Sequence, residues 1–133
     1  MAQNIRYSVM TDYKELYETA VRASEKSYSP YSSFRVGSAL LSSDGKIFTG
    51  CNIENSSYSL TVCAERTAIF KAVSEGITDF EAIAIYGTEN PCIPCGACLQ
   101  VMSEFCNADF KIVLSDGVHT FSEFLPNVFS LKK

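Results

Sequence analysis

The sequence lacks any cluster of lysine and arginine of the kind that marks nucleic-acid-binding proteins. Its 133 residues include 11 Lys and Arg against 15 Asp and Glu, which gives a formal net charge of −4. Such an acidic chain offers no positive surface to a phosphate backbone. The composition therefore argues against a protein that acts on RNA or DNA, and it favours a small-molecule substrate.

Long apolar runs are also missing. No stretch approaches the length of about 20 residues that crosses a bilayer, and residues 1–6 lack the apolar segment of a signal peptide. The six cysteines are therefore expected to be reduced thiols or metal ligands rather than disulfides. We expect a cytoplasmic protein that does not contact membranes. Repeats, low-complexity tracts and linkers are absent, which predicts one domain over residues 1–133.

What is present is an alternation of helical and strand patterns. Helices are expected near 12–27, 61–76, 94–107 and 122–125, and strands at 36–42, 46–52, 81–87, 110–115 and 118–121. Turn residues at 43–45 and 116–117 make the strands on either side of each turn antiparallel. The pattern predicts an α/β fold, a three-layer α/β/α architecture with a mixed sheet of about five strands.

Four residues are expected to set helix ends. Asp12 and Thr61 are candidate N-caps, and Pro94 is a suitable first helical residue. Gly76 is a candidate stop signal.

Two segments carry the chemistry, TVCAER at 61–66 and PCGAC at 94–98. Catalytic zinc takes three protein ligands and keeps a fourth position for water. Cys63, Cys95 and Cys98 are the candidate ligands, with Glu65 as a carboxylate beside the metal. A lone C-x-x-C is weak evidence, but C-A-E followed by P-C-x-x-C is the arrangement typical of zinc nucleobase deaminases.

The electrostatics of three thiols constrain such a site. Helix N-termini favour thiolates, but Zn²⁺ with three thiolates is formally −1 and ionises water less readily than a more positive zinc. We expect Arg66 to donate hydrogen bonds to the sulfurs and Glu65 to take the proton. Residues i and i+2 of a helix point about 200° apart. Cys63 and Glu65 can therefore meet only if Cys63 lies in the irregular first turn.

These motifs, together with CNIEN at 51–55 and YSPYSSFRVG at 28–37, resemble the small cytidine deaminases over most of the chain. The resemblance implies one zinc per chain and hydrolysis of cytidine and deoxycytidine to uridine nucleosides and ammonia, as in pyrimidine salvage. In this chemistry Glu65 would pass a proton from water to N3 of the base. It would then help to protonate the departing amino group. Leu99 stands where the family commonly has Arg, a difference that leaves the zinc ligands alone.

The resemblance also implies substrate contacts. Asn52 and Glu54 would hydrogen-bond the sugar hydroxyls, and Phe34 would pack on the base or sugar. The backbone N–H of Ala64 would bind the base oxygen. Phe129 would come from a neighbouring subunit, which implies a homo-oligomer, a tetramer, with shared active sites.

Other interpretations stay open at this stage. Cys92 is an alternative ligand, and a closed four-cysteine site would make the protein a non-catalytic zinc module. Cys51 and Cys106 are most simply small buried residues. His119, the one histidine, is expected to be exposed beside a turn. The same chemistry would also suit a deaminase of a cytosine-containing antibiotic or modified nucleoside. Arg66 could be an ordinary surface charge, and Tyr58 could line the pocket or merely pack in its loop.

Overall fold

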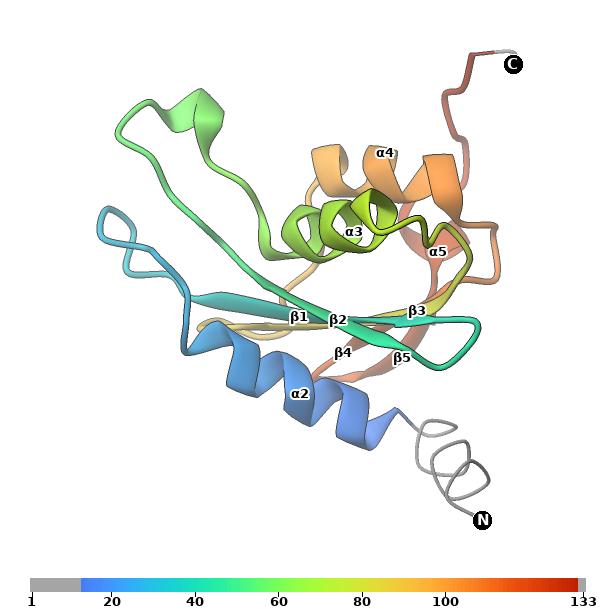
Figure 1. The fold of residues 1–133 in the computed structure, drawn as a ribbon, viewed down its shortest axis with the longest axis horizontal. Helices are drawn as coiled ribbons and strands as arrows, with labels where there is room; N and C mark the ends of the chain where they lie inside the picture. Colours follow the sequence, from blue (N-terminus) through green and yellow to red (C-terminus); the bar gives the residue numbers. More distant parts are fainter. Residues whose placement is uncertain (1–12, 132–133) are drawn as a thin grey trace.

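The computed structural model describes residues 13–131 and shows one mixed sheet between layers of helices (Figure 1). In chain order the elements are α2 (Lys14–Ser24), β1 (Val36–Ser42), β2 (Ile47–Cys51), a 3₁₀ turn η1 (Tyr58–Leu60), α3 (Ala64–Ser74), β3 (Phe80–Gly87), α4 (Gly96–Phe105), β4 (Lys111–Leu114), β5 (Gly117–Thr120) and α5 (Phe121–Phe124). None of the helices in this part of the chain has the length and apolarity that crossing a membrane requires.

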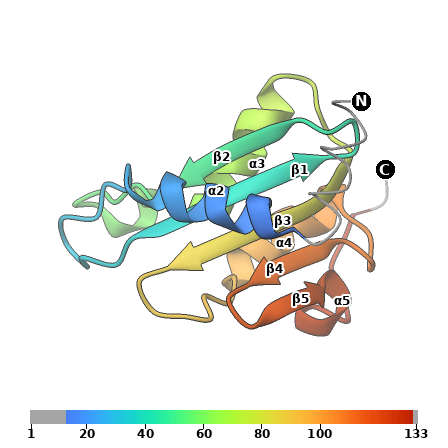
Figure 2. The same ribbon diagram turned by 90° about the horizontal axis from the view of Figure 1, so that it is seen from below.

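The sheet has the order β2-β1-β3-β4-β5. Strands β3 and β4 are parallel and the other neighbouring pairs are antiparallel. Helix α2 lies on one face, and α3 and α4 lie side by side on the other (Figures 1 and 2). The predicted three-layer α/β/α fold with five strands is confirmed.

The core has two parts because successive side chains of a strand point to opposite faces. On β1, Leu40 packs in the cluster under α3 and α4, and its neighbour Leu41 packs in the cluster under α2. Both leucines are almost completely buried. Helices cover the central strands on both sides, as the nearly continuous apolar pattern of β3 predicts.

The topology brings the two cysteine segments together. Strands β2 and β3 both run antiparallel to β1, so their carboxyl ends lie at the same edge of the sheet. The chain leaves β2 towards α3 and leaves β3 towards α4. Both helices therefore begin at this edge, which is where α/β proteins generally place their ligands (Figure 1).

Two predicted helix starts are wrong by a few residues. Helix α3 has Cys63, not Thr61, as its N-cap. The reason is that Val62 and Ile53 exchange backbone hydrogen bonds of 3.0 Å, which keeps the chain extended up to the cap. Helix α4 has Cys95 as its N-cap, so Pro94 lies just outside it, and the Leu99 N–H donates to the Cys95 carbonyl.

Other element ends vary in how well the pattern predicted them. Gly76, with φ of 87°, directly follows the C-cap of α3, as predicted. Helix α2 ends at Ser24 rather than near Ser27 because Tyr28 already bonds to the extended segment that follows β2. The predicted cap Asp12 lies outside the described residues.

Strand β2 and the first turn of α3 approach each other closely at Gly50. A Cβ atom on Gly50 would lie 2.4 Å from the Ala64 carbonyl oxygen and 2.6 Å from the Ala68 nitrogen. The Ser38 hydroxyl of β1 donates to the same Ala64 oxygen at 2.7 Å. The start of α3 is therefore held firmly against the sheet, directly after Cys63.

Candidate metal centre

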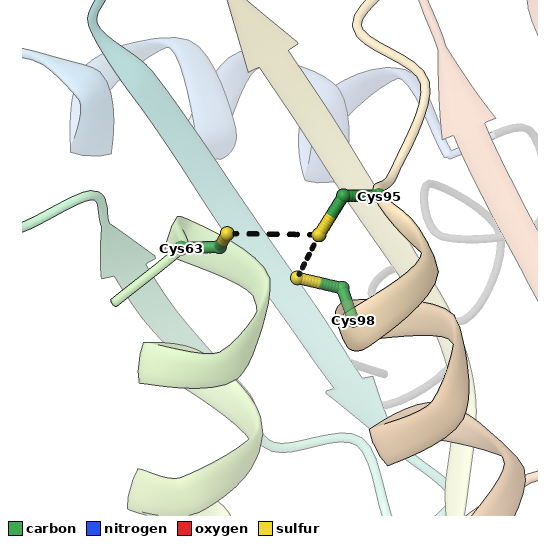
Figure 3. A group of neighbouring side chains, drawn as sticks. All are labelled: Cys63, Cys95 and Cys98. Atoms are coloured by element: carbon green, nitrogen blue, oxygen red, sulfur yellow. Dashed lines mark hydrogen bonds between the residues drawn. The ribbon is translucent and has the colours of Figure 1, made fainter. Parts of the chain in front are cut away.

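Three sulfur atoms converge where α3 and α4 begin (Figure 3). The Sγ atom of Cys95 lies 3.8 Å from that of Cys63 and 3.6 Å from that of Cys98. All three sulfurs lie within 4.8 Å of one another. The sequence proposed these same three residues as ligands, and the fold brings them together from segments about thirty residues apart.

The spacing of the sulfurs fits zinc. Four ligands in a tetrahedron with Zn–S bonds of about 2.3 Å place sulfurs about 3.8 Å apart. Thiolates are also ligands that zinc prefers. Cys98 is fully buried and Cys95 is exposed, so the group is anchored in the core on one side and open on the other.

Cys92 does not belong to this group. Within residues 13–131, the cluster that could hold a metal contains Cys63, Cys95 and Cys98 and no fourth residue. The closed four-cysteine site is therefore wrong, and a tetrahedral ion here keeps one position for another ligand. Burial raises the pKa of the Cys92 thiol to about 11. All six cysteines lie in the described part of the chain and are free, as the sequence predicted.

The backbone conformation of Cys63 allows its side chain and that of Glu65 to reach the same site, although the two residues are only two positions apart. Cys63 is the N-cap of α3, with extended φ and ψ of −72° and 155°. Its side chain is therefore not constrained by the helical rotation between i and i+2. Cys95 is an N-cap with the same extended backbone, at φ −74° and ψ 167°. Both caps place sulfur at the positive end of a helix dipole.

The pKa values of the Cys63 and Cys98 thiols shift in opposite directions. The pKa of Cys63 falls to about 5, mainly because Cys98 donates a hydrogen bond to it and also because Arg66 does. The pKa of Cys98 is raised, since its proton is held in that same hydrogen bond and its sulfur is buried. Cys63 is thus a thiolate at neutral pH, and metal binding must displace the proton from Cys98.

Arg66 supplies positive charge to the sulfurs. Its Nη2 donates to Cys63 Sγ at 3.1 Å, and this hydrogen bond raises the guanidinium pKa. Its buried Nε has no hydrogen-bond partner among residues 13–131. The side chain is directed at the thiolate and is not an ordinary surface charge.

Glu65 is a buried carboxyl beside the sulfurs. It is 4% exposed. Burial raises its pKa to about 7, and the negative charge of Cys63 acts in the same direction. A carboxyl group with a pKa near neutrality can both accept and release a proton at physiological pH.

Asn52 is held by the backbone ahead of β1. Its Oδ1 accepts hydrogen bonds from the Val36 N–H, at 3.0 Å, and from the Ser27 hydroxyl, and its Nδ2 donates to the Phe34 carbonyl at 2.7 Å. An amide group has two N–H donors and two lone pairs on oxygen. One N–H of Asn52 therefore remains for a ligand.

Glu54 lies on an exposed loop at the same edge of the sheet. It borders a cavity of about 280 Å³ that is also lined by Tyr31, Ser32, Tyr58 and Thr61. The ring of Tyr58 meets that of Tyr31 edge-on, with centroids 6.4 Å apart. Tyr58 is thus both a cavity-lining and a loop-packing residue.

The remaining predicted contact residues come from other segments of the chain. Phe34 is half-buried against the core, and the side chain of Ala64 is fully buried. Phe129 is 67% exposed on the C-terminal tail, where Gln100 Nε2 donates to its carbonyl oxygen at 3.0 Å. His119, in β5, bonds to Asp116 and Glu123 and takes no part in the sulfur cluster.

Sequence reasoning missed three polar side chains that organise this region. Ser27 bonds to Asn52, Ser32 bonds to Glu54, and Gln100 bonds to the tail. The abundance of serine in 27–33 was a usable signal, since hydroxyls in loops commonly bond to nearby acceptors. Gln100 had no signal beyond its position after Cys98.

The chain is similar to known proteins of one family. Residues 10–114 match the family model described as the cytidine and deoxycytidylate deaminase zinc-binding region. The cytidine deaminase of Sporosarcina psychrophila is 50% identical over 125 residues, covering 90% of this chain and 92% of that protein. The cytidine deaminase of Halalkalibacterium halodurans is 51% identical over 125 residues, with 90% and 95% covered.

Solved structures agree with this match. The crystal structure of cytidine deaminase from Burkholderia pseudomallei superposes with a TM-score of 0.81 at 46% identity, covering 86% of this chain and 97% of that one. That of cytidine deaminase from Mycobacterium tuberculosis gives a TM-score of 0.84 at 36% identity, with 90% and 98% covered. The cysteine cluster, the fold and these likenesses point in the same direction.

Proposed function

The chain belongs to the cytidine and deoxycytidylate deaminase family, and on this premise we propose that it hydrolyses cytidine and deoxycytidine to uridine and deoxyuridine with release of ammonia. It is a zinc enzyme with one ion per chain. The observation that carries the proposal is the convergence of three sulfurs at zinc spacing, with one position left for another ligand, beside the buried Glu65.

The residues of the chain divide the chemical work. Cys63, Cys95 and Cys98 hold the zinc, which when bound supplies a Lewis acid that polarises water and positions it for attack. Glu65 accepts a proton from the water and delivers it to N3 of the cytosine ring as the water oxygen adds to C4. Glu65 then takes the remaining proton from the C4 hydroxyl and delivers it to the departing amino group, so ammonia leaves and the C4 carbonyl forms. The atoms balance as nucleoside plus water giving uridine nucleoside plus ammonia.

The properties of Glu65 suit both proton transfers. A carboxylate with an ordinary pKa would accept a proton weakly at neutral pH, whereas burial brings that of Glu65 to about 7 in the metal-free chain. Arg66 offsets charge, because Zn²⁺ and three thiolates sum to −1 and the guanidinium adds +1. A zinc centre of this total charge promotes loss of a proton from water less than a cationic zinc would. A base at Glu65 is therefore still needed.

The nucleoside is bound by groups around the same edge of the sheet. The free N–H of Asn52 and the carboxylate of Glu54 would bond to sugar hydroxyls, one donating and the other accepting. Phe34 would pack on the base or sugar, and the backbone N–H of Ala64 would bind the base oxygen. These hydroxyl-directed groups favour a plain nucleoside over a modified one.

The C-terminal tail supports a proposal about the oligomeric assembly. Phe129 is exposed in the single chain, which supports a contact with substrate bound to a neighbouring copy, as the family resemblance implies. We propose a homotetramer with shared active sites. We further propose a single domain over 1–133, a cytoplasmic location and a role in pyrimidine salvage.

The test measures ammonia release from cytidine and deoxycytidine together with metal content. The wild-type protein should turn over both with one zinc per chain. Glu65→Gln, which keeps the size and removes the basic carboxylate, should retain zinc and lose at least about 10²-fold in kcat, the lower range for a general acid–base group.

Two cysteine variants serve as controls. Cys92→Ser should keep both zinc and activity, whereas Cys63→Ser should lose both. Full activity of Glu65→Gln would refute the proton shuttle. A protein that binds zinc and leaves every cytosine nucleoside unchanged would instead be a non-catalytic zinc module.

A further inference from the structure

The Glu54 carboxylate accepts hydrogen bonds from a loop that lies more than twenty residues earlier in the chain. Its Oε1 accepts hydrogen bonds from the backbone N–H groups of Tyr31, at 3.0 Å, and Ser32, at 3.2 Å. Its Oε2 accepts a hydrogen bond from the Ser32 hydroxyl. Three donors from two adjacent residues therefore converge on one carboxylate, and such charge-assisted bonds are stronger than neutral ones.

The Ser32 hydroxyl makes a second contact in the opposite direction. It accepts a hydrogen bond of 3.0 Å from the backbone N–H of Phe34. A hydroxyl donates once and has two lone pairs, so it can serve both neighbours at once. Ser32 thereby connects Glu54 to Phe34, the two proposed substrate contacts that come from different segments.

The conformation between these contacts is not one that the backbone prefers on its own. Ser33 has φ of 59°, in the left-handed region that is unfavourable for residues with a side chain. The loop keeps this turn because the hydrogen bonds on either side of Ser33 require it. These hydrogen bonds therefore offset the cost of the left-handed conformation directly before Phe34.

The same groups border a cavity in the surface of the chain. Ser32 and Glu54 line the cavity of about 280 Å³, together with Tyr31, Tyr58 and Thr61. The hydrogen bond from the Ser32 hydroxyl lowers the pKa of the Glu54 carboxyl. Glu54 is thus kept ionised and correctly aimed as an acceptor while one side of it faces the cavity.

We propose that Ser32 is a positioning residue for nucleoside binding, whose hydroxyl holds the Glu54 carboxylate and the Phe34 backbone in one fixed relation. This inference rests on the proposed function, because it concerns how that substrate is held. Ser32 acts through Glu54 and Phe34 and plays no part in the proton transfers at Glu65. Its loss should therefore weaken binding and leave the chemical step intact.

The experiment compares Ser32→Ala with wild type in the zinc-loaded enzyme. The KM for cytidine should rise about 10-fold, the effect of one hydrogen bond to a charged group, and kcat should change by less than about twofold. Hydrogen exchange at the Phe34 amide should become faster because its acceptor is gone. Ser32→Thr, which keeps the hydroxyl, should restore KM.

The matched control is Ser56→Ala. Ser56 is exposed on the neighbouring loop, so KM should equal that of wild type. Should Ser32→Ala not fold, Ser32→Cys preserves the size, loses most of the hydrogen bonding and carries the same expected result.

An unchanged KM in Ser32→Ala, or a fall in kcat at constant KM, would overturn the inference while leaving the proposed function in place. Failure of the wild-type protein to deaminate cytidine would overturn the proposed function instead. The two outcomes are separated by the wild-type measurement.

Discussion

Cys63 occupies the one type of position from which its sulfur and Glu65 can serve the same site. As the residue before the first helical turn it has an extended backbone, and it lies at the positive N-terminal end of α3. The hydrogen bonds from Cys98 and Arg66 lower its pKa to about 5. A residue whose own side chain is weakly acidic is thus an anionic ligand because of two neighbouring side chains.

The role of Arg66 is testable by Arg66→Gln. Removing the guanidinium leaves the three thiolates and zinc with an uncompensated charge, so zinc affinity or kcat should fall about 10- to 100-fold, as for other outer partners of metal ligands. Competition with a chelator measures the affinity, and ammonia release measures kcat.

Lys71→Gln is the matched control for Arg66→Gln. It removes a cation from the same helix whose Nζ bonds to the Thr49 carbonyl and to no sulfur. If Arg66→Gln behaves like this control in both measurements, the guanidinium is a packing group and not a charge partner.

At the scale of elements, the start of α3 is positioned by β2 rather than by a capping side chain. The Cys63 side chain makes no cap hydrogen bond, and Thr61, which the pattern favoured as a cap, belongs to the extended segment paired with residue 53. Gly50 and Ser38 hold the first turn of α3 through the Ala64 carbonyl. The close packing of helix on strand therefore decides where the sulfur of Cys63 lies.

Gly50→Ala tests this packing. Its Cβ would lie 2.4 Å from a backbone oxygen, so helix or strand must shift. We expect a loss of about 1–3 kcal/mol in the free energy of unfolding, the usual range for overpacking. Zinc affinity should fall as well, because the displaced segment directly follows Cys63.

Gly96→Ala is the comparison, since nothing lies within 4 Å of the Cβ it would add and alanine favours a helix. Thermal or denaturant unfolding of both variants checks the difference. Equal stability of Gly50→Ala and wild type would mean that α3 is not held at this point.

At the scale of the whole molecule, the single chain exposes several large apolar side chains. Tyr58, Leu60, Ile93 and Phe129 are each more than half exposed. The exposed ring of Phe129 is available for contact with a neighbouring copy. Gln100 Nε2 donates a hydrogen bond to the Phe129 carbonyl oxygen and so attaches the tail to α4.

Mixed oligomers of two variants test whether each active site is shared between neighbouring copies. If Phe129 completes a neighbour's site, Phe129→Ala and Glu65→Gln should each have low activity alone. In co-expressed mixed oligomers, however, sites with both intact groups form, roughly a quarter of all sites under random assembly. Steady-state deamination by the purified mixed species provides the measurement.

Ser130→Ala, an exposed residue of the same tail, should retain full activity alone. If mixing yields only the average of the two parent activities, or if Phe129→Ala is fully active, each site is built from one chain.

Residue identity and local spacing determined the chemistry of this protein. The three cysteines, the carboxylate at 65 and the α/β pattern were readable because ligand type, helical period and strand alternation are properties of short segments. Only the tertiary structure decided which cysteine lies outside the sulfur cluster and where α3 begins. It also decided how Ser32 connects Glu54 to Phe34. These features depend on contacts between segments far apart in sequence, and the order β2-β1-β3 alone places those segments at one edge.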